Sequence, residues 1–347
     1  MRDGYKTAWQ SALQESIVML SRRTFGTGAI GTALGLRTTA AVAQPANGVG
    51  AGRKRRVGVM LPVPRNDQFL AVLQEGLRKI GWGENDIEFE VRRANGSAEQ
   101  FRTFAQEFAA MDLDVMITAS TAAATAFKKA TSTIPIVFVG TFEPVTAGLV
   151  ASMEHPGGNA TGTAGFQTDI AVDWVAILKA IAPQVSRMAI FYNPATAARG
   201  AVEGWRAAAS RSIEMSEVRV DTIADIDRVL AEVAKDPQAG LIDIPHTFTL
   251  SNRDAVVAAM AAHRVPAIYG VAEMVRSGGL VSYGQDLGDH WRLGATYIDR
   301  ILRGAKPADL PAQFSTNYAL AINTRAAKAL NLVVPPAMLS RASEVIE

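Results

Sequence analysis

Runs of apolar residues alternate with amphipathic stretches along most of the chain. The run at 134–139 (IPIVFV) has no polar alternation, a pattern typical of a strand covered on both faces of a parallel sheet. Stretches with apolar residues at helical spacing lie between such runs. The predicted strands cover 56–61, 87–91, 115–118, 134–139, 187–192, 218–220, 241–244, 265–269, 278–284 and 319–322. The predicted helices cover 69–80, 101–111, 121–130, 174–181, 199–213, 226–233, 256–260, 287–302 and 326–330.

The alternation occurs in two series, separated by the helix-breaking passage HPGGN at 155–159. Repeated strand–helix units predict a parallel, doubly wound sheet with right-handed crossovers. We therefore predict an α/β protein of two such lobes. At 347 residues, the chain is long enough for both.

The N-terminal residues resemble an export signal rather than part of either lobe. Arg22-Arg23 precedes a short apolar run at 26–36, and Ala41-Val42-Ala43 has the form of a signal-peptidase site. Residues 1–43 therefore predict a signal peptide of the twin-arginine type, with residues 44–54 as a flexible linker. The mature chain, beginning at Gln44, is expected in the periplasm. The sequence GTGAIG at 26–31 matches G-x-G-x-x-G, but no strand precedes it, so it predicts no dinucleotide site.

Composition narrows the functional classes. A net charge of +2 predicts no broad basic surface for nucleic acid. The chain has no cysteine, and its 4 histidines are scattered without ligand spacing, so neither a metal nor another cofactor is expected. No nucleophile elbow, Walker A or H-E-x-x-H motif occurs, so we predict that the chain is not an enzyme.

Long segments of the chain resemble the ABC transporter substrate-binding family that includes tryptophan- and tyrosine-type binding proteins. The resemblance rests on three segments: 134–162 (IPIVFVGTFEPVTAGLVASMEHPGGNATG), 265–270 and 277–311, with 322–347 (INTRAAKALNLVVPPAMLSRASEVIE) following. It implies a type I periplasmic binding fold with a multi-strand hinge. It also implies a monomer that works with a membrane permease and an ATPase.

By analogy with the ligand-binding core of lac-repressor-type proteins, the first lobe would take 55–163 and about 285–304. The second lobe would take 164–284 and about 305–325, leaving 326–347 as a C-terminal segment. The chain departs from the family pattern at Glu143, where Asp is common. It also departs at 246–248 (HTF) and 313–315 (QFS). The first two departures bear on which ligand is held.

Polar residues that follow the strands are the candidate ligand contacts, because ligands of open α/β sheets bind beyond the carboxyl ends of strands. In the first lobe, Ser120 and Thr121 open a helix, whose N-terminus suits a carboxylate. The alternative is an ordinary N-cap. Thr141 and Glu143 follow the next strand. Glu143 would pair with a ligand ammonium, or else it is a solvated turn residue.

The second lobe contributes candidates in the same way. They are Tyr192, Asn193, His246, Glu273 and Tyr283. Tyr283 would stack on a flat ligand group, with a hinge or core position as the alternative. Asp243 lies within an apolar strand, which favours a structural role over a cleft position, and the tryptophans at 174, 205 and 291 are expected in the core.

These observations favour a periplasmic receptor that closes two lobes on a small solute, an amino acid or related carboxylate. One alternative is an exported α/β enzyme of hydrolase type, for which Ser120 is the nearest nucleophile but has no assigned histidine. The other is a ligand-binding sensor subunit, which the sequence does not separate from a transport receptor.

Overall fold

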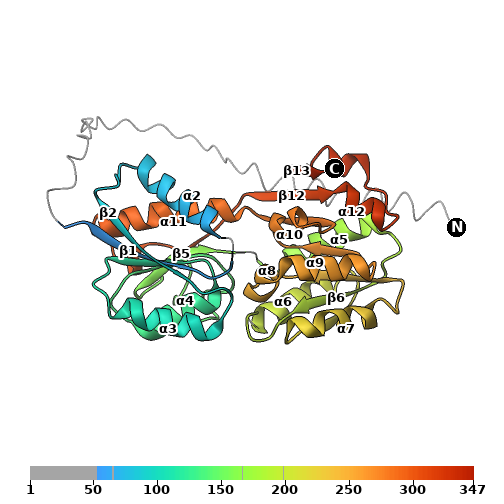
Figure 1. Ribbon diagram of the computed structural model, residues 1–347, viewed down its shortest axis with the longest axis horizontal. Helices are drawn as coiled ribbons and strands as arrows, with labels where there is room; N and C mark the ends of the chain where they lie inside the picture. Colours follow the sequence, from blue (N-terminus) through green and yellow to red (C-terminus); the bar gives the residue numbers. More distant parts are fainter. Residues whose placement is uncertain (1–52, 65, 166, 198) are drawn as a thin grey trace, which may run out of the picture. The chain divides into compact units, whose positions relative to one another are not determined.

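The computed structural model describes residues 53–347 except 65, 166 and 198. Two sheets with flanking helices make up this part of the chain (Figure 1). The predicted signal peptide and most of the linker lie outside the described residues. Among the described residues, no helix is both long and apolar enough to cross a membrane.

The first lobe begins with regular β–α units. Its elements are β1 (Arg55–Leu61), α2 (Asp67–Lys79), β2 (Ile87–Arg93), α3 (Ala98–Ala109), β3 (Val115–Thr118), α4 (Thr121–Ala130), β4 (Ile136–Thr141) and β5 (Ala160–Ala164). The six-stranded sheet has the order β11-β5-β4-β3-β1-β2, and every neighbouring pair is parallel. Its strand β11 (Gln313–Phe314) and the helix α11 (Leu287–Leu302) that packs on it come from the C-terminal part of the chain.

Alternate residues of the first-sheet strands point into two separate cores. Val57 and Val59 pack with α2 and α11, whereas Met60 packs with α3 and α4. Figure 1 shows these two helix pairs on opposite faces of the sheet. Both faces are covered, which explains the unbroken apolar runs in the sequence.

The second lobe repeats the same series. Its elements are α5 (Ile170–Ile181), β6 (Arg187–Tyr192), α6 (Arg199–Ala209), β7 (Glu214–Arg219), α7 (Ile223–Val233), β8 (Ala239–Asp243), α8 (Thr247–Ser251), α9 (Arg253–Ala262), β9 (Ala267–Tyr269), α10 (Ala272–Arg276) and β10 (Val281–Gln285). The seven-stranded sheet has the order β13-β12-β10-β9-β8-β6-β7. The predicted α/β class with two doubly wound lobes is confirmed, with an antiparallel β10–β12 pair as the one departure among the described strands.

The C-terminal part of the chain contributes to both lobes. Its elements are α11 (Leu287–Leu302), a 3₁₀ turn (Pro307–Asp309), β11 (Gln313–Phe314), β12 (Tyr318–Asn323), α12 (Thr324–Ala329), α13 (Pro336–Leu339) and β13 (Glu344–Ile346). Helix α11 packs on the first sheet, where Gly294 lies so close to the strands that an added Cβ would be 2.9 Å from Ile117 and Val139.

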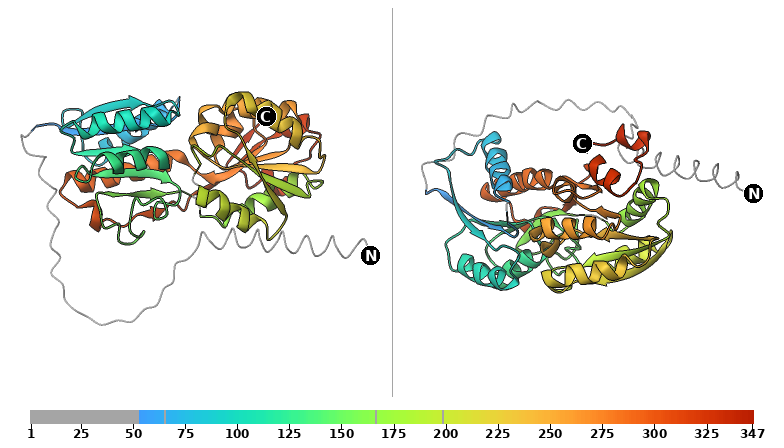
Figure 2. Two further views of the ribbon diagram at one scale, coloured as in Figure 1. Left: turned by 90° about the horizontal axis from the view of Figure 1, so that it is seen from below. Right: turned by 45° about the vertical axis from the view of Figure 1, so that its right-hand side comes forward.

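The chain crosses between the lobes in this region too. We expected 305–325 in the second lobe, but β11 pairs with β5 in the first sheet. Strand β12 then pairs with β10 in the second sheet, and β13 extends that sheet beyond β12. The red C-terminal residues lie with the second lobe in both views of Figure 2.

Strand β5 was not predicted from the sequence. Its residues, ATGTA, are small or polar and carry little strand signal. Gly162 has φ +148°, and a Cβ there would lie 1.8 Å from the Phe138 carbonyl oxygen of β4. The close approach of the two backbones therefore requires glycine.

Candidate functional site

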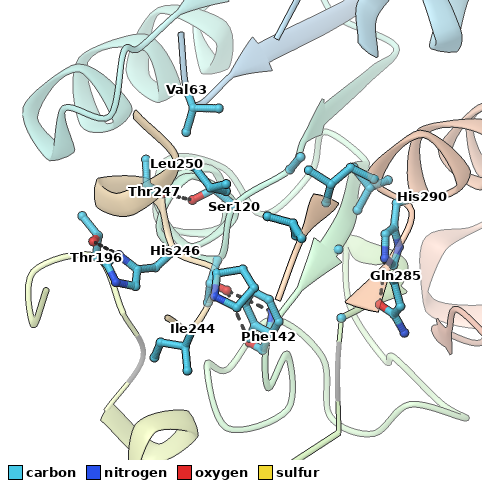
Figure 3. Close-up of a pocket in the computed structure, with 18 of the residues that line it drawn as sticks. Val63, Ser120, Phe142, Thr196, Ile244, His246, Thr247, Leu250, Gln285 and His290 are labelled. Carbon is cyan, nitrogen blue, oxygen red and sulfur yellow. Dashed lines mark hydrogen bonds between the residues drawn. The ribbon is translucent and has the colours of Figure 1, made fainter. Parts of the chain in front are cut away.

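The two sheets have the same order around their first strand, and this order indicates at which edge each sheet would bind a ligand. In each, the first strand of the lobe lies between the second and third (β2-β1-β3 and β7-β6-β8). The chain therefore reverses direction across the sheet at β1/β3 and at β6/β8, and ligands of such sheets bind beyond the carboxyl ends at this point. One pocket is lined by the loops from both reversal points (Figure 3).

The pocket has aromatic walls and scattered polar groups. Phe69 stacks on Trp291 with ring centroids 6.2 Å apart, and Phe142 meets Trp205 edge-on at 5.4 Å. The polar residues that line the pocket are Asn66, Ser120, Thr121, Thr196, His246, Thr247, Gln285 and His290. A mostly apolar pocket with a few polar groups is typical of a small-molecule site.

Ser120 and Thr121 lie in the pocket where the sequence placed them. Ser120 caps α4, since its Oγ accepts a hydrogen bond from the Ala123 N–H at 3.4 Å. Its hydroxyl also lies 3.2 Å from that of Thr247, which begins α8 in the other lobe. The two lobes therefore contact each other directly at the pocket (Figure 3). Thr121 Oγ1 accepts from the Phe142 N–H at 3.1 Å and thereby fixes the loop after β4.

His246 belongs to a closed ring of hydrogen bonds in the second lobe. The backbone N–H of Asn193 donates to Nε2 at 3.3 Å, so this nitrogen carries no proton. Nδ1–H therefore donates to Thr196 Oγ1 at 3.1 Å, and Thr196 donates to Asn193 Oδ1 at 3.2 Å. Burial lowers the pKa of His246 to about 3, so the imidazole is neutral at pH 7.

His290, on α11, is held in a similar way. Gln285 Nε2 donates to the Ser315 carbonyl at 2.6 Å, which turns its Oε1 towards His290 Nε2 at 2.9 Å. The proton therefore lies on Nε2, and Nδ1 accepts from Thr163 at 2.8 Å. Burial lowers the pKa of His290 to about 4.

Thr141 and Glu143 lie away from the pocket lining. Thr141 is fully buried, and its Oγ1 has no partner among the described residues. Glu143 has φ +46° and accepts a hydrogen bond from Thr146 at 3.2 Å. It borders a separate hollow together with Gln167 and Phe314.

Four of the five candidates of the second lobe are not among the pocket-lining residues. Tyr192 donates to Glu217 at 3.1 Å, and Asn193 holds its own loop by donating to the Val220 and Asp221 carbonyls. Glu273 pairs with Arg276 at 3.4 Å, and Tyr283 stacks on Tyr318 at 5.6 Å. Of the sequence candidates, the pocket lining brings together Ser120, Thr121 and His246.

Several lining residues were not predicted as site residues. They are Trp205, assigned to the core, and Thr196, Thr247, Gln285, His290 and Asn66. Thr196 and Thr247 also follow β6 and β8, slightly further along the chain than Asn193 and His246. The rule that polar residues after a strand contact the ligand would have included them if it had covered longer loops. His290 and Trp291 come from α11, whose return to the first lobe is a tertiary feature.

The described residues of the pocket show no arrangement suited to covalent chemistry. Each pocket histidine is hydrogen-bonded to a threonine: His246 donates to Thr196, and His290 accepts from Thr163, which is fully buried. No group of acidic, histidine or cysteine side chains that could hold a metal ion occurs among the described residues. The arrangement suits binding through shape, stacking and hydrogen bonds.

Two doubly wound lobes that share one pocket at their reversal points define a two-lobed solute-binding protein. The family model for ABC transporter substrate binding proteins matches residues 56–346. The chain belongs to this family, as the sequence resemblance predicted.

Curated and solved relatives agree with this family. The chain is 24% identical over 293 residues to a tyrosine-binding protein of Clostridioides difficile (strain R20291), covering 81% of this chain and 82% of the relative. It resembles an ABC domain of Streptococcus pneumoniae solved with L-Trp, with a TM-score of 0.79, 24% identity and coverage of 84% and 100%. A conserved domain protein of Vibrio cholerae has a TM-score of 0.78 and 28% identity, with coverage of 84% and 99%.

Proposed function

We propose that this protein is the periplasmic receptor of an ABC importer, which captures a small solute, an amino acid or related carboxylate, between its lobes and presents it to a permease. Members of the family bind small solutes and work with permease and ATPase components, and the relatives include a tyrosine-binding protein. The proposed export through a twin-arginine signal rests on the sequence of residues 22–43.

The observation that carries this proposal is the pocket that loops from the reversal points of both lobes line. Ser120 and Thr121 come from the first sheet, and His246 and Thr247 come from the second. A solute that contacts both loops stabilises the arrangement in which the lobes are close, because it gains contacts that the separated lobes lack. Such binding requires no chemical step.

A thermal-shift screen tests the proposal. The mature chain from Gln44 is mixed with a panel of amino acids, aromatic carboxylates, small amides and polyols, and the melting temperature is measured. A ligand that binds the native state at 100 times its Kd stabilises it by about 2.7 kcal/mol, which raises the melting temperature by several degrees. No shift with any member of the panel, at millimolar concentration, would contradict the proposal.

A further inference from the structure

We infer that the solute has a flat apolar body bearing oxygen acceptors and carries no ammonium group. This inference rests on the proposed function and narrows it, because it selects des-amino carboxylates over α-amino acids. It follows from the hydrogen-bonding groups that the pocket offers and those that it lacks.

Among the described residues, the pocket offers no carboxylate partner for a positive charge. Among the described residues, no aspartate or glutamate lines it, and the residues of 53–347 outside the described set include no acidic residue. Glu143 borders the separate hollow, and Glu273 pairs with Arg276. An ammonium buried here would lose its hydration without gaining a carboxylate.

The acceptor nitrogens of the two imidazoles and the Gln285 amide oxygen are also already in use. His246 Nε2 accepts from the Asn193 N–H, His290 Nδ1 accepts from Thr163, and Gln285 Oε1 accepts from His290. Because both imidazoles are held in one tautomer, neither can turn a lone pair towards a ligand without breaking a buried hydrogen bond.

Donors, in contrast, remain available. Trp205 lines the pocket and is 2% exposed, yet its indole Nε1–H has no hydrogen-bond partner among the described residues. A buried donor without a partner is costly unless a ligand completes it. The first turn of α4 adds the N–H groups of Thr121 and Ala122, since that of Ala123 already donates to Ser120, at the end of the helix that favours negative charge.

The walls define the rest of the ligand. Phe69 and Trp291 stack in parallel, and Phe142 meets Trp205 edge-on, so aromatic surface contributes from both lobes. A planar apolar body would lie against these rings. An aromatic carboxylate without an amino group combines such a body with the acceptor oxygens that the donors require.

Two matched ligand pairs test this inference directly. Titration calorimetry compares L-tyrosine with 3-(4-hydroxyphenyl)propionate, and L-tryptophan with indole-3-propionate; within each pair only the ammonium group differs. We expect the des-amino acid to bind at least tenfold more tightly in at least one pair. Equal or tighter binding of the amino acid in both pairs would overturn the inference and leave the proposed function standing. No binding in either pair would overturn the inference alone if another solute of the thermal-shift panel binds, and both proposals if none does.

A pair of tryptophan variants tests the role of the indole donor. Trp205→Phe keeps an aromatic ring and removes the N–H, so the affinity for the des-amino acid should fall about tenfold. Trp174→Phe is the matched control, because the Trp174 Nε1–H donates to the Tyr283 carbonyl at 2.7 Å and Trp174 is not a lining residue. It should lower the melting temperature and leave the affinity within twofold. Equal affinity losses in the two variants, or none in Trp205→Phe, would show that the Trp205 N–H does not bind the solute.

Discussion

At the scale of single residues, the interior beside the pocket contains titratable groups that the fold keeps uncharged. His246 and His290 are 6% and 2% exposed, and Asp243, at the end of β8, is 1% exposed. Burial lowers the pKa of both histidines and raises the pKa of Asp243 well above its ordinary value. The stability of the protein therefore depends on pH in two opposite ways.

The histidines should make the protein sensitive to mild acid. Their pKa values are about 3 and 4 in the folded state against about 6.5 when unfolded, so the unfolded chain binds more protons as the pH falls below 6.5. Between pH 7 and pH 5, each histidine should reduce the free energy of unfolding by about 2 kcal/mol. Urea titrations at the two pH values measure this loss.

A variant separates the contribution of one histidine from that of other groups. His246→Gln cannot take up a proton on unfolding, so its loss of stability between pH 7 and pH 5 should be smaller by about 2 kcal/mol. The comparison of losses is independent of how much the substitution destabilises the protein at pH 7. An equal loss in the variant and the natural chain would show that His246 is not held neutral.

Asp243 should act in the opposite direction. Burial favours its protonated form, a hydrogen bond from Thr249 opposes this only in part, and Oδ1 has no partner among the described residues. Because the unfolded carboxyl ionises near pH 4, the folded state loses stability relative to the unfolded state as the pH rises above that value. Asp243→Asn removes this penalty, so its stability relative to the natural chain should increase from pH 4 to pH 8 in chemical denaturation. A difference that is constant with pH would contradict the neutral carboxyl.

At the scale of elements, apolar periodicity predicted the regular β–α units well. Strand β6 and helix α11 have the bounds that the sequence predicts, Arg187–Tyr192 and Leu287–Leu302. Strand β5, the five-residue helices α8 and α10, and the short edge strands β11 and β13 were missed. The three strands are defined by pairing with distant segments, and the residues of all five elements carry too little periodicity to reveal them.

The difference between local sequence signals and contacts of distant segments also explains which pocket residues were predicted. Ser120, Thr121 and His246 follow strands and were found by that rule. Trp205 and His290 reach the pocket from helices, and which face of a helix meets a pocket depends on packing between elements distant in the sequence.

The pairing of β4 with β5 gives a prediction at this scale. Gly162→Ala would place a Cβ 1.8 Å from the Phe138 carbonyl oxygen at φ +148°. Backbone strain and overpacking together should cost about 3 kcal/mol or more of unfolding free energy in urea titrations. Gly148→Ala is the matched control, because Gly148 also has positive φ (+70°) but an added Cβ meets nothing within 4 Å. Its cost should be about 1 kcal/mol. Equal costs would show that the close approach of the two strands is not maintained.

At the scale of the whole binding unit, the lobes contact each other outside the ligand pocket. A Cβ added at Gly96, after β2, would lie 2.6 Å from Ser251 Oγ, at the end of α8. Neither residue lines the pocket. This contact exists only while the lobes are close, so a larger side chain there should oppose closure without touching the solute.

Ser251→Leu should therefore weaken solute binding by about tenfold through the closed state alone. Small-angle scattering should show less compaction on addition of the solute than for the natural chain. Ser251→Ala adds no bulk and removes a buried hydroxyl that has no partner among the described residues, so its affinity should stay within twofold. Tight binding by Ser251→Leu would show that the solute is held without this approach of the lobes.

The late strands have a consequence for biosynthesis. The first sheet acquires β11 only at Gln313–Phe314, and the second acquires β12 and then β13, which ends at Ile346. A nascent chain still attached to the ribosome therefore has neither half complete and presents unpaired strand edges on both. A premature stop codon before Gln313 would leave both sheets incomplete, whereas one between β11 and β12 would complete the first sheet and leave the second without β12 and β13.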